Sequence, residues 1–495
     1  MMPSDAPTNT TAAADGGLPT YPDVAQVERR LAALVARPPV QLKEAALRGW
    51  LAHFDERCAR SKAMITEARE RIPGGVQHNL AFNHPFPLVI DRAAGPYLWD
   101  LDGNQYIDFL QAGGPTILGS NPDAVRLPVA DVVARCGPST GLFHEFELKL
   151  AREISRHMPA VEMFRMLGSG TESVMAAIRV ARLATGKSCI IKMGGAYHGW
   201  SDQVVYGLKI PGTRRFEAHG IPIASSAFTT EARSNDPASL ERLLRLNRLR
   251  GGTAAVLVEP VGPESGTRPV DRGFNAEVRR LCDKFGALLV FDEVVTGFRL
   301  GLGGAQGYFG VWPDLTVFGK IVAGGYPGAG GLGGRRDLLR RVAAGLESGK
   351  KRAYVGGTLA ATPISAAAGY FAIREIERTR ACEAAGRAGD RLARGLEALV
   401  AKRQLPFVVY NQGSICHLET VGGMFVPLSY LRIFKALREI KERKHWMEQY
   451  GAAYAAEGLI TLAGSRLYTS AADTDEVIDD ALARFDRVFA GVEGA

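Results

Sequence analysis

Residues 163–193 read MFRMLGSGTESVMAAIRVARLATGKSCIIKM, and this stretch decides the fold. Two short β-prone runs, 163–167 and 189–193, enclose a segment with helical periodicity at 172–184. The alternation continues downstream, where apolar runs such as 287–291 are separated by further helical segments. Short runs that are apolar throughout are typical of strands buried on both faces of a sheet. The sequence therefore predicts an α/β fold in which helices cover a mostly parallel sheet.

The chain has 495 residues, which is more than the roughly 250–300 residues that one hydrophobic core usually serves. We therefore expect more than one domain, with boundaries where the character of the sequence changes. We predict a disordered tail over 1–22, a helical N-terminal extension over 23–72, the N-terminal part of a small domain over 73–130, a large ligand-binding domain over 131–365 and a C-terminal small α+β domain over 366–495.

Three local patterns add detail to this organisation. Apolar residues recur at helical spacing over 24–35 and over 42–71, so the N-terminal extension is expected to be helical along both stretches. The tripeptide Asp102-Gly103-Asn104 separates two β-prone runs and predicts a hairpin. The glycine-rich stretch 324–334 is expected to be a loop.

Composition excludes several classes of protein. Apolar residues make up 46% of the chain and charged residues 23%, which excludes wholesale disorder. The net charge of +8 comes from basic residues spread along the chain, so it predicts a solvated surface and no nucleic-acid partner. Six widely separated cysteines without a CxxC pair predict neither a metal site nor a disulfide framework. With no secretory signal and no apolar run long enough for a membrane, a cytoplasmic protein is expected.

The loop at 168–173 is a candidate anion site. It reads GSGTES between a predicted strand and a predicted helix, at the strand end where open α/β sheets bind ligands. Hydroxyls and the first N–H groups of the helix would suit a phosphate, although the loop lacks the lysine of a P-loop. A simple helix cap is the alternative interpretation.

Two ionisable residues stand at other strand ends. Asp292 follows the apolar run 287–291, where a carboxylate is costly unless it meets a cation; a cap or a buried ion pair is the alternative. Lys320 lies between the apolar run 315–318 and the glycine-rich stretch. A lysine buried there would lose its proton easily and become a nucleophile, whereas a solvent-exposed lysine is the alternative.

These features agree with one another. A phosphate seat, a strand-end carboxylate and a buried lysine are the anchors that pyridoxal phosphate requires. Tyr197 in the run GAYHG at 195–199 is placed to stack on the ring of that cofactor, with a core position as the alternative.

Several longer motifs occur in a fixed order along the chain: IPGG at 72–75, YLWDLDGNQYIDF at 97–109, GSGTES at 168–173, YHG at 197–199, VEPV at 258–261, FDEVVTGFR at 291–299 and GGAQGYFGVWPDLTVFGK at 303–320. With these motifs the chain resembles, from about residue 65 to 485, the class III, fold-type I aminotransferases. Within that family it is most similar to the branch of glutamate-1-semialdehyde aminomutases and β-amino-acid aminotransferases.

The resemblance implies pyridoxal 5'-phosphate as the cofactor of the large domain, and a homodimer whose active sites are shared. It implies that Lys320 forms the Schiff base and moves the proton, and that Asp292 pairs with the ring nitrogen. The other implied positions surround the cofactor: Val294 beneath the ring, Tyr197 and His198 beside it, Glu259 near the ring hydroxyl, Ser169, Gly170 and Thr171 at the phosphate, and Thr358 reaching the phosphate from the second subunit.

Two departures from the aminomutase pattern bear on the substrate. The arginine expected after the Pro-Gly-Gly turn is absent from 76–82, which reads VQHNLAF. The glutamate expected before Ser470-Ala471-Ala472 is replaced by Ser465 or Arg466. His78 and Arg299 remain as candidates for a substrate carboxylate, with a structural role as the alternative for Arg299.

We therefore predict an aminotransferase that moves an amino group from an amine, or from a β- or ω-amino acid, to a keto acceptor by ping-pong chemistry. An intramolecular aminomutase of the glutamate-1-semialdehyde type is the alternative. A homologue without catalytic activity, or a nucleic-acid binder, would lack the yellow colour of a pyridoxal phosphate enzyme.

Overall fold

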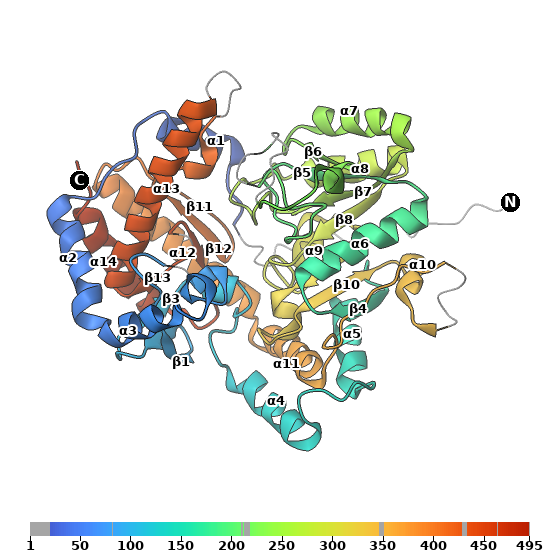
Figure 1. Ribbon diagram of the computed structural model, residues 1–495, viewed down its shortest axis with the longest axis horizontal. Coiled ribbons are helices and arrows are strands. Elements are labelled where there is room, and N and C mark those ends of the chain that lie inside the picture. The colour runs from blue at the N-terminus through green and yellow to red at the C-terminus, as the bar shows by residue number, and fades with distance from the viewer. Residues whose placement is uncertain are drawn as a thin grey trace.

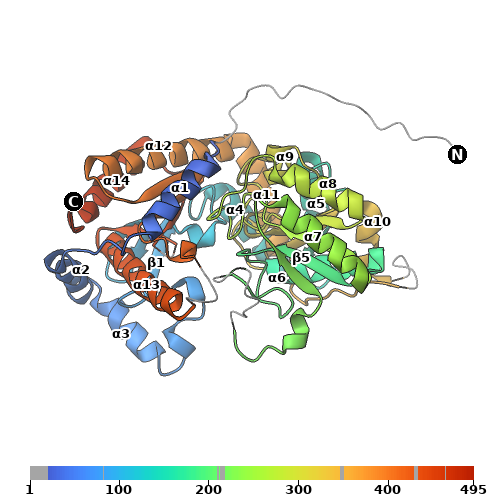
Figure 2. The ribbon, with the colours of Figure 1, turned by 90° about the horizontal axis from the view of Figure 1, so that it is seen from above.

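A computed structural model of the chain describes residues 20–81, 83–208, 211, 218–345, 351–427, 433–462 and 464–494. Of the tail predicted over 1–22, residues 1–19 lie outside these ranges. Figures 1 and 2 show two groups of elements: the first and last parts of the chain lie together on one side, and the middle of the chain forms the other. Nowhere in the described ranges does a helix have the length and apolar character needed to cross a membrane.

The middle of the chain forms a seven-stranded sheet in the order β4-β10-β9-β8-β7-β5-β6. The contiguous strands β9, β8, β7, β5 and β6 pair in parallel, whereas β10 is antiparallel to both of its neighbours. The predicted parallel-dominated sheet is confirmed. The strands are β4 (Met163–Leu167), β5 (Cys189–Met193), β6 (Thr229–Ala232), β7 (Thr253–Val258), β8 (Leu288–Asp292), β9 (Leu315–Gly319) and β10 (Gly330–Gly334).

Helices cover both faces of this sheet, as expected from strands that are apolar throughout. On one face Leu257 and Val290 pack in a core with α6 (Gly170–Thr185). On the other face their strand neighbours Val256 and Leu289 pack with α7 (Pro237–Asn247) and α8 (Phe274–Phe285). Alternate residues of one strand thus enter different cores, which explains why the side chains on both faces of the strand are apolar.

The prediction that the glycine-rich stretch 324–334 is a loop is wrong for its second half, which forms strand β10. A side chain would not fit in this strand. A Cβ added to Gly330 would lie 2.4 Å from the backbone oxygen of Ser169, and one added to Gly331 would lie 2.4 Å from the ring of Phe164. Glycine therefore allows β10 to insert between β4 and β9 in contact with the loop that begins α6.

The remaining strands form two smaller sheets from both ends of the chain. The predicted hairpin is confirmed as β2 (Tyr97–Asp100) and β3 (Gln105–Asp108), which join β1 (Ile90–Ala94) and, in parallel, β13 (Leu459–Ile460). The second sheet contains β11 (Val408–Gln412), β12 (Ile415–Glu419) and β14 (Arg466–Tyr468). A common core joins them to α12 (Ala381–Lys402), α13 (Ile433–Ala456) and α14 (Asp475–Ala490).

Helix α11 (Pro363–Thr379) packs with α4 (Asp123–Cys136) and α5 (Glu145–His157), in a core that also contains Phe318 of β9. Its C-cap, Arg380, has a left-handed backbone, and α12 then enters the core of the smaller sheets. We propose that the large domain ends near Arg380, after α11, instead of at residue 365.

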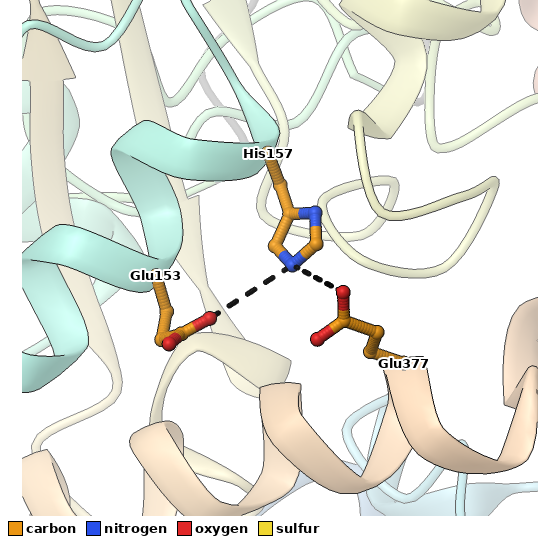
Figure 3. Close-up of side chains that lie close together, drawn as sticks. All are labelled: Glu153, His157 and Glu377. Atoms are coloured by element: carbon orange, nitrogen blue, oxygen red, sulfur yellow. Dashed lines mark ion pairs between the residues drawn. The ribbon is translucent and has the colours of Figure 1, made fainter.

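An ionic cluster links α5 to α11 (Figure 3). Glu153 and His157 of α5 face Glu377 of α11, and the imidazole Nε2 lies 4.0 Å and 3.9 Å from the two carboxylates. The Arg156 guanidinium donates to both carboxylates, and Arg374 lies 3.5 Å from Glu153. Two arginines thus balance two glutamates, so the cluster has no surplus negative charge for a metal cation and acts as a link between helices.

The N-terminal extension consists of α1 (Val24–Val35), α2 (Glu44–Arg57) and α3 (Ala59–Ala68). The helix expected over 42–71 is wrong in one respect, because it breaks at Cys58, whose φ of −125° and ψ of 34° are not helical. Asp102 in the turn of the β2–β3 hairpin accepts the backbone N–H groups of Arg60 and Ser61 at 2.8 and 3.0 Å. A side chain from another part of the chain thus caps α3, and periodicity alone cannot reveal such a cap.

The extension and Tyr21, at the end of the tail predicted over 1–22, together tie the two groups of elements to each other. Leu31 and Leu34 of α1 pack against Val408 and Tyr410 of β11. Just before α1, the hydroxyl of Tyr21 donates to the carbonyl oxygen of Val270 at 2.6 Å, within the middle part of the chain. The extension is therefore an integral part of the packing and has no separate core.

We predict that Leu31→Ala lowers the free energy of unfolding by about 2–5 kcal/mol, because the truncation leaves a cavity against β11. Gln26→Ala, an exposed position on the same helix, should stay within about 0.5 kcal/mol of the unchanged protein. Equilibrium denaturation of both variants measures the difference. Equal stability of the two variants would show that α1 contributes no packing energy.

Candidate active site

A cavity of about 650 Å³ opens at the carboxyl ends of the parallel strands of the large sheet. The loops that follow β4, β5, β8 and β9 form most of its wall, as expected for an open α/β sheet. It is lined by His78, Pro115, residues 168–171 and 197–199, Asp292, Val294, Gly319, Lys320 and residues 325–329. The predicted catalytic and cofactor-binding residues are thus brought to one cavity, except for Glu259 and Thr358.

The start of α6 forms one end of the cavity. Ser169 is the N-cap, and its hydroxyl accepts the N–H of Glu172 at 3.3 Å. The N–H groups of Gly170 and Thr171 lie in the first turn, where no partner exists within the helix. Gly199 packs so closely that a Cβ there would lie 2.4 Å from Oγ1 of Thr171. The cradle therefore offers N–H groups, hydroxyls and the positive end of a helix to an anion.

Asp292 and His198 form a buried hydrogen-bonded pair that lines the cavity. Oδ2 of Asp292 lies 2.7 Å from Nδ1 of His198, and Oδ1 accepts the N–H of Val294 at 3.1 Å. Nε2 of His198 is buried and has no hydrogen-bond partner among the described residues. The carboxylate is therefore held in one orientation at the end of β8, where it faces the cavity.

Lys320 begins the turn that follows β9, with a left-handed φ of 52°. Its ammonium donates to the carbonyl oxygen of Gly113, which belongs to the turn η3 (Gln111–Gly113). Burial is the main cause that lowers the pKa of Lys320, and the charges of Arg466 and Arg299 act in the same direction. The amine thus loses its proton at a lower pH than an ordinary lysine, which makes it available as a nucleophile.

Val294 forms the floor between the phosphate cradle and the lysine. A Cβ added to Gly170 or to Gly319 would lie 2.8 Å from a methyl group of Val294. The absence of side chains at these two glycines therefore lets Val294 pack directly against both loops. Tyr197 lines the wall with 47% of its surface exposed, a position from which its ring can cover a ligand.

Glu259 and Thr358 lie differently from the other predicted residues. The buried carboxylate of Glu259 accepts N–H groups of Tyr197 and Glu264 at 2.8 Å, and so joins the loop after β5 to the loop after β7. Burial, together with the charges of Asp292 and Glu264, raises the pKa of Glu259 to about 8. Thr358 is exposed on the surface of the described chain.

Arg299 is a structural residue in this chain, so the expectation that it is available to a substrate carboxylate is wrong. The side chain is completely buried and donates to the carbonyl oxygens of Gly114 at 2.6 Å and Thr469 at 3.0 Å. It also donates to Gln111 and Ser414 at 3.1 Å. The guanidinium thus fixes the turn that contains Gly113, the acceptor for Lys320. The other candidate, His78, lies exposed at the rim of the cavity.

Three features near Lys320 were missed by the analysis of the sequence. Gly114 brings Lys320 next to Tyr468, since a Cβ on Gly114 would lie 3.5 Å from the tyrosine ring and 3.8 Å from Cδ of the lysine. Arg466 donates to the hydroxyl of Tyr468 at 3.4 Å and forms an ion pair with Glu264 at 3.1 Å. No local pattern announces these contacts, because β14 lies more than 140 residues after Lys320.

The arrangement fits pyridoxal phosphate. The anion cradle at α6 suits the phosphate, the Asp292 carboxylate suits a protonated ring nitrogen, and the desolvated amine of Lys320 suits the aldehyde. Gly170, Gly199 and Gly319 clear the space that side chains would occupy. The sheet and this site define a pyridoxal phosphate enzyme of fold type I.

Comparison with known proteins agrees with this class. The family model described as aminotransferase class-III matches residues 80–482. A glutamate-1-semialdehyde 2,1-aminomutase from Desulforapulum autotrophicum is 36% identical over 450 residues, which are 88% of this chain and 99% of that protein. An enzyme of the same name from Roseiflexus castenholzii is 41% identical over 362 residues, which are 72% of this chain and 81% of that protein.

Solved structures share the fold over most of their length. An omega-transaminase from Sphaerobacter thermophilus superposes with a TM-score of 0.77 at 26% identity, covering 87% of this chain and 97% of its own. A transaminase with PLP bound gives the same TM-score, identity and coverage. The chain belongs to the class III aminotransferases, and pyridoxal 5'-phosphate is its cofactor.

We predict that Arg299→Met lowers the free energy of unfolding by roughly 3 kcal/mol or more, because several buried acceptors lose their donor at once. Arg280→Met removes an arginine that is 56% exposed on α8 and should change stability by less than about 1 kcal/mol. Denaturant unfolding of the two variants gives the comparison. If Arg299→Met were as mild as Arg280→Met, the guanidinium would not brace the turn at Gly113.

Proposed function

We propose that the cavity catalyses the transfer of an amino group between two carbon skeletons, with Lys320 as the catalytic base. When bound, pyridoxal phosphate supplies an electron sink next to the carbon that carries the amine. The residues at 169–171 bind its phosphate, and Tyr197 and Val294 enclose its ring. The Asp292 carboxylate provides the negative charge that favours a protonated ring nitrogen, and His198 keeps that carboxylate in place. Nζ of Lys320 accepts the proton from the substrate carbon that carries the amine, and it would deliver that proton to the aldehyde carbon of the bound cofactor.

We also propose that Arg466 receives a carboxylate of the substrate. The guanidinium is joined to the surroundings of Lys320 through Tyr468, and its charge lowers the pKa of the lysine. It is held by Glu264 and by the hydroxyl of Thr267 at 2.9 Å. A planar guanidinium can bind a carboxylate with two parallel hydrogen bonds, which the exposed imidazole of His78 cannot do.

The observation that carries the proposal is this cation beside Lys320. Aminomutases of the branch that this chain resembles carry a glutamate in the segment that here contains Ser465 and Arg466. In those enzymes the acid helps to retain the reaction intermediate in the active site. A basic group in the same segment suits a substrate with a carboxylate and cannot take the place of that acid. We therefore propose a transaminase that uses a separate keto acceptor, with a β- or ω-amino acid as donor.

The second candidate is an intramolecular aminomutase. The two curated relatives at 36% and 41% identity are both named glutamate-1-semialdehyde 2,1-aminomutase, and these names favour the aminomutase more strongly than the transaminase. The omega-transaminase at 26% identity supports the first candidate. Both reactions use the same lysine, carboxylate and phosphate cradle, so the substrate decides between them.

The deciding experiment uses two assays. With a panel of amines and amino acids plus a keto acid, we expect parallel-line kinetics and a strict need for the acceptor. With glutamate-1-semialdehyde alone, we expect slow or no formation of 5-aminolevulinate. Arg466→Met should raise KM about tenfold for donors with a carboxylate, the effect of one charge-assisted hydrogen bond, and leave KM unchanged for simple amines. Its effect on the pKa of Lys320 should change kcat for both kinds of donor alike.

Lys320→Ala is the control and should abolish turnover in both assays. Efficient isomerisation of glutamate-1-semialdehyde without an acceptor would contradict the transaminase and support the intramolecular aminomutase. Equal effects of Arg466→Met on KM for amines and for amino acids would remove the arginine from substrate binding.

We further propose that the enzyme is a homodimer in which Thr358 completes the partner's phosphate site. Thr358 lies on the surface together with two large exposed side chains, Tyr354 and Leu359, with 66% and 65% of their surface accessible. Leu142 and Phe143 are also strongly exposed, at 80% and 74%. Large apolar side chains with this exposure are typical of an interface that is covered in the assembled protein.

Hybrid dimers test the shared site. Thr358→Ala should weaken cofactor binding, and Lys320→Ala should be inactive. When the two variants are mixed and allowed to exchange subunits, half of the sites in a hybrid contain both Lys320 and Thr358, so activity should reappear. A mixture that stays as inactive as Lys320→Ala, at a cofactor concentration that does not saturate Thr358→Ala, would contradict a shared site.

A further inference from the structure

Lys192 is a basic residue in the middle of the apolar strand β5. The side chain has no exposed surface. It does not line the cavity, although the strand leads directly into the loop with Tyr197 and His198. An ammonium in such a place is destabilising by several kcal/mol unless oxygen atoms replace its hydration shell. The contacts of Lys192 show where these oxygen atoms come from.

Three backbone carbonyl groups surround the ammonium. Nζ donates to the carbonyl oxygens of Ala196 at 3.0 Å, Val204 at 3.0 Å and Tyr206 at 2.6 Å. The ring of Tyr206 also faces the nitrogen, with its centroid 5.1 Å away. All three acceptors belong to the connection that leaves β5. The three N–H groups of one ammonium thus gather three points of one loop.

The same loop is held on its other side by groups of the active site. The N–H of Tyr197 donates to Glu259 at 2.8 Å, and Nδ1 of His198 lies 2.7 Å from Asp292. Ala196, whose carbonyl binds Lys192, directly precedes these two residues. The loop is therefore clamped between a buried ammonium behind it and two carboxyl groups on its other side, of which Asp292 lines the cavity.

We propose that Lys192 is a positioning residue of the cofactor site. Its charge organises the loop 196–206 from behind, so that Tyr197 and His198 present their side chains to the ligand. The inference rests on the proposed function in one respect, namely that Tyr197 and His198 contact the bound cofactor. Lys192 itself touches neither the cofactor nor the substrate.

A lysine is well suited to this role. Methionine has a similar length and would fill the space, but it would leave the three carbonyl oxygens without a donor. Arginine would keep the charge, yet its donors lie in a plane and its head is larger. Arginine should therefore restore the loop only in part.

Lys187 provides a matched control. Its ammonium also joins backbone carbonyl groups, those of Phe285 at 3.0 Å and of Gly286. It lies before β5, at the opposite end of the strand from the cavity. Lys187→Met therefore removes the same kind of contact from the same region of the sheet without touching the loop 196–206.

The test compares Lys192→Met, Lys192→Arg and Lys187→Met as full-length holoenzymes. We would measure the dissociation constant of pyridoxal phosphate, the visible circular dichroism of the bound cofactor and the melting temperature of the cofactor-free protein. Lys192→Met should raise the dissociation constant about tenfold or more and change the circular dichroism band. Lys192→Arg should lie between Lys192→Met and the unchanged protein. Lys187→Met should lower the melting temperature alone.

The proposal is overturned if Lys192→Met lowers the melting temperature like Lys187→Met while the dissociation constant stays within twofold of the unchanged protein. If Lys192→Met yields no folded protein, Lys192→Arg decides by the same two readouts: weaker cofactor binding supports the proposal, and a change in melting temperature alone overturns it. Failure of the unchanged protein to bind pyridoxal phosphate would instead contradict the function of the cavity, so the two failures are distinguishable.

Discussion

Buried cations held by backbone carbonyl groups are the constraint on which this structure depends. Lys320 donates to Gly113, Arg299 to Gly114 and Thr469, and Lys192 to three carbonyls of one loop. Each cation loses hydration when it is buried, and a carbonyl oxygen replaces part of it without neutralising the charge. Such a contact fixes a turn of the backbone and joins segments that are distant in sequence.

The active site lies where these contacts meet. Lys320 follows β9, its hydrogen-bond acceptor Gly113 belongs to η3, and its neighbour Tyr468 belongs to β14. Elements from three parts of the chain therefore surround the amine of this lysine. Arg299 donates both to the turn at Gln111 and Gly114 and to Thr469, the residue after Tyr468, and so holds these two segments together. The packing of the large domain against the two smaller sheets is therefore a condition for the desolvation of Lys320, and desolvation in turn lowers its pKa.

The charge around the lysine also bears on the choice of substrate. Asp292 provides negative charge on the side of the sheet, whereas Arg466, paired with Glu264, lies on the side of β14. These groups are compatible with both candidate reactions of the proposed function.

Much of the fold could be predicted from the sequence because the signals are local. Short β-prone runs predicted the strands at 163–167 and 189–193, and turn residues predicted the hairpin at Asp102-Gly103-Asn104. The lysine, the carboxylate and the phosphate cradle each follow a strand, and parallel strands bring their carboxyl ends to one edge. Topology therefore gathers these residues even before the packing is known.

Other features were decided only by the tertiary structure, because their causes lie far away in the sequence. Strand β10 looks like a loop until β4 and β9 enclose its glycines, and α2 ends at Cys58 where the hairpin caps α3. Arg299 has the appearance of a substrate ligand until Gly114 and Thr469 approach it from other segments. The sequence by itself determined which chemical groups are present and at which strand ends they stand. The tertiary structure decided which of them are desolvated and held, since burial and hydrogen-bond partners are properties of the packed chain.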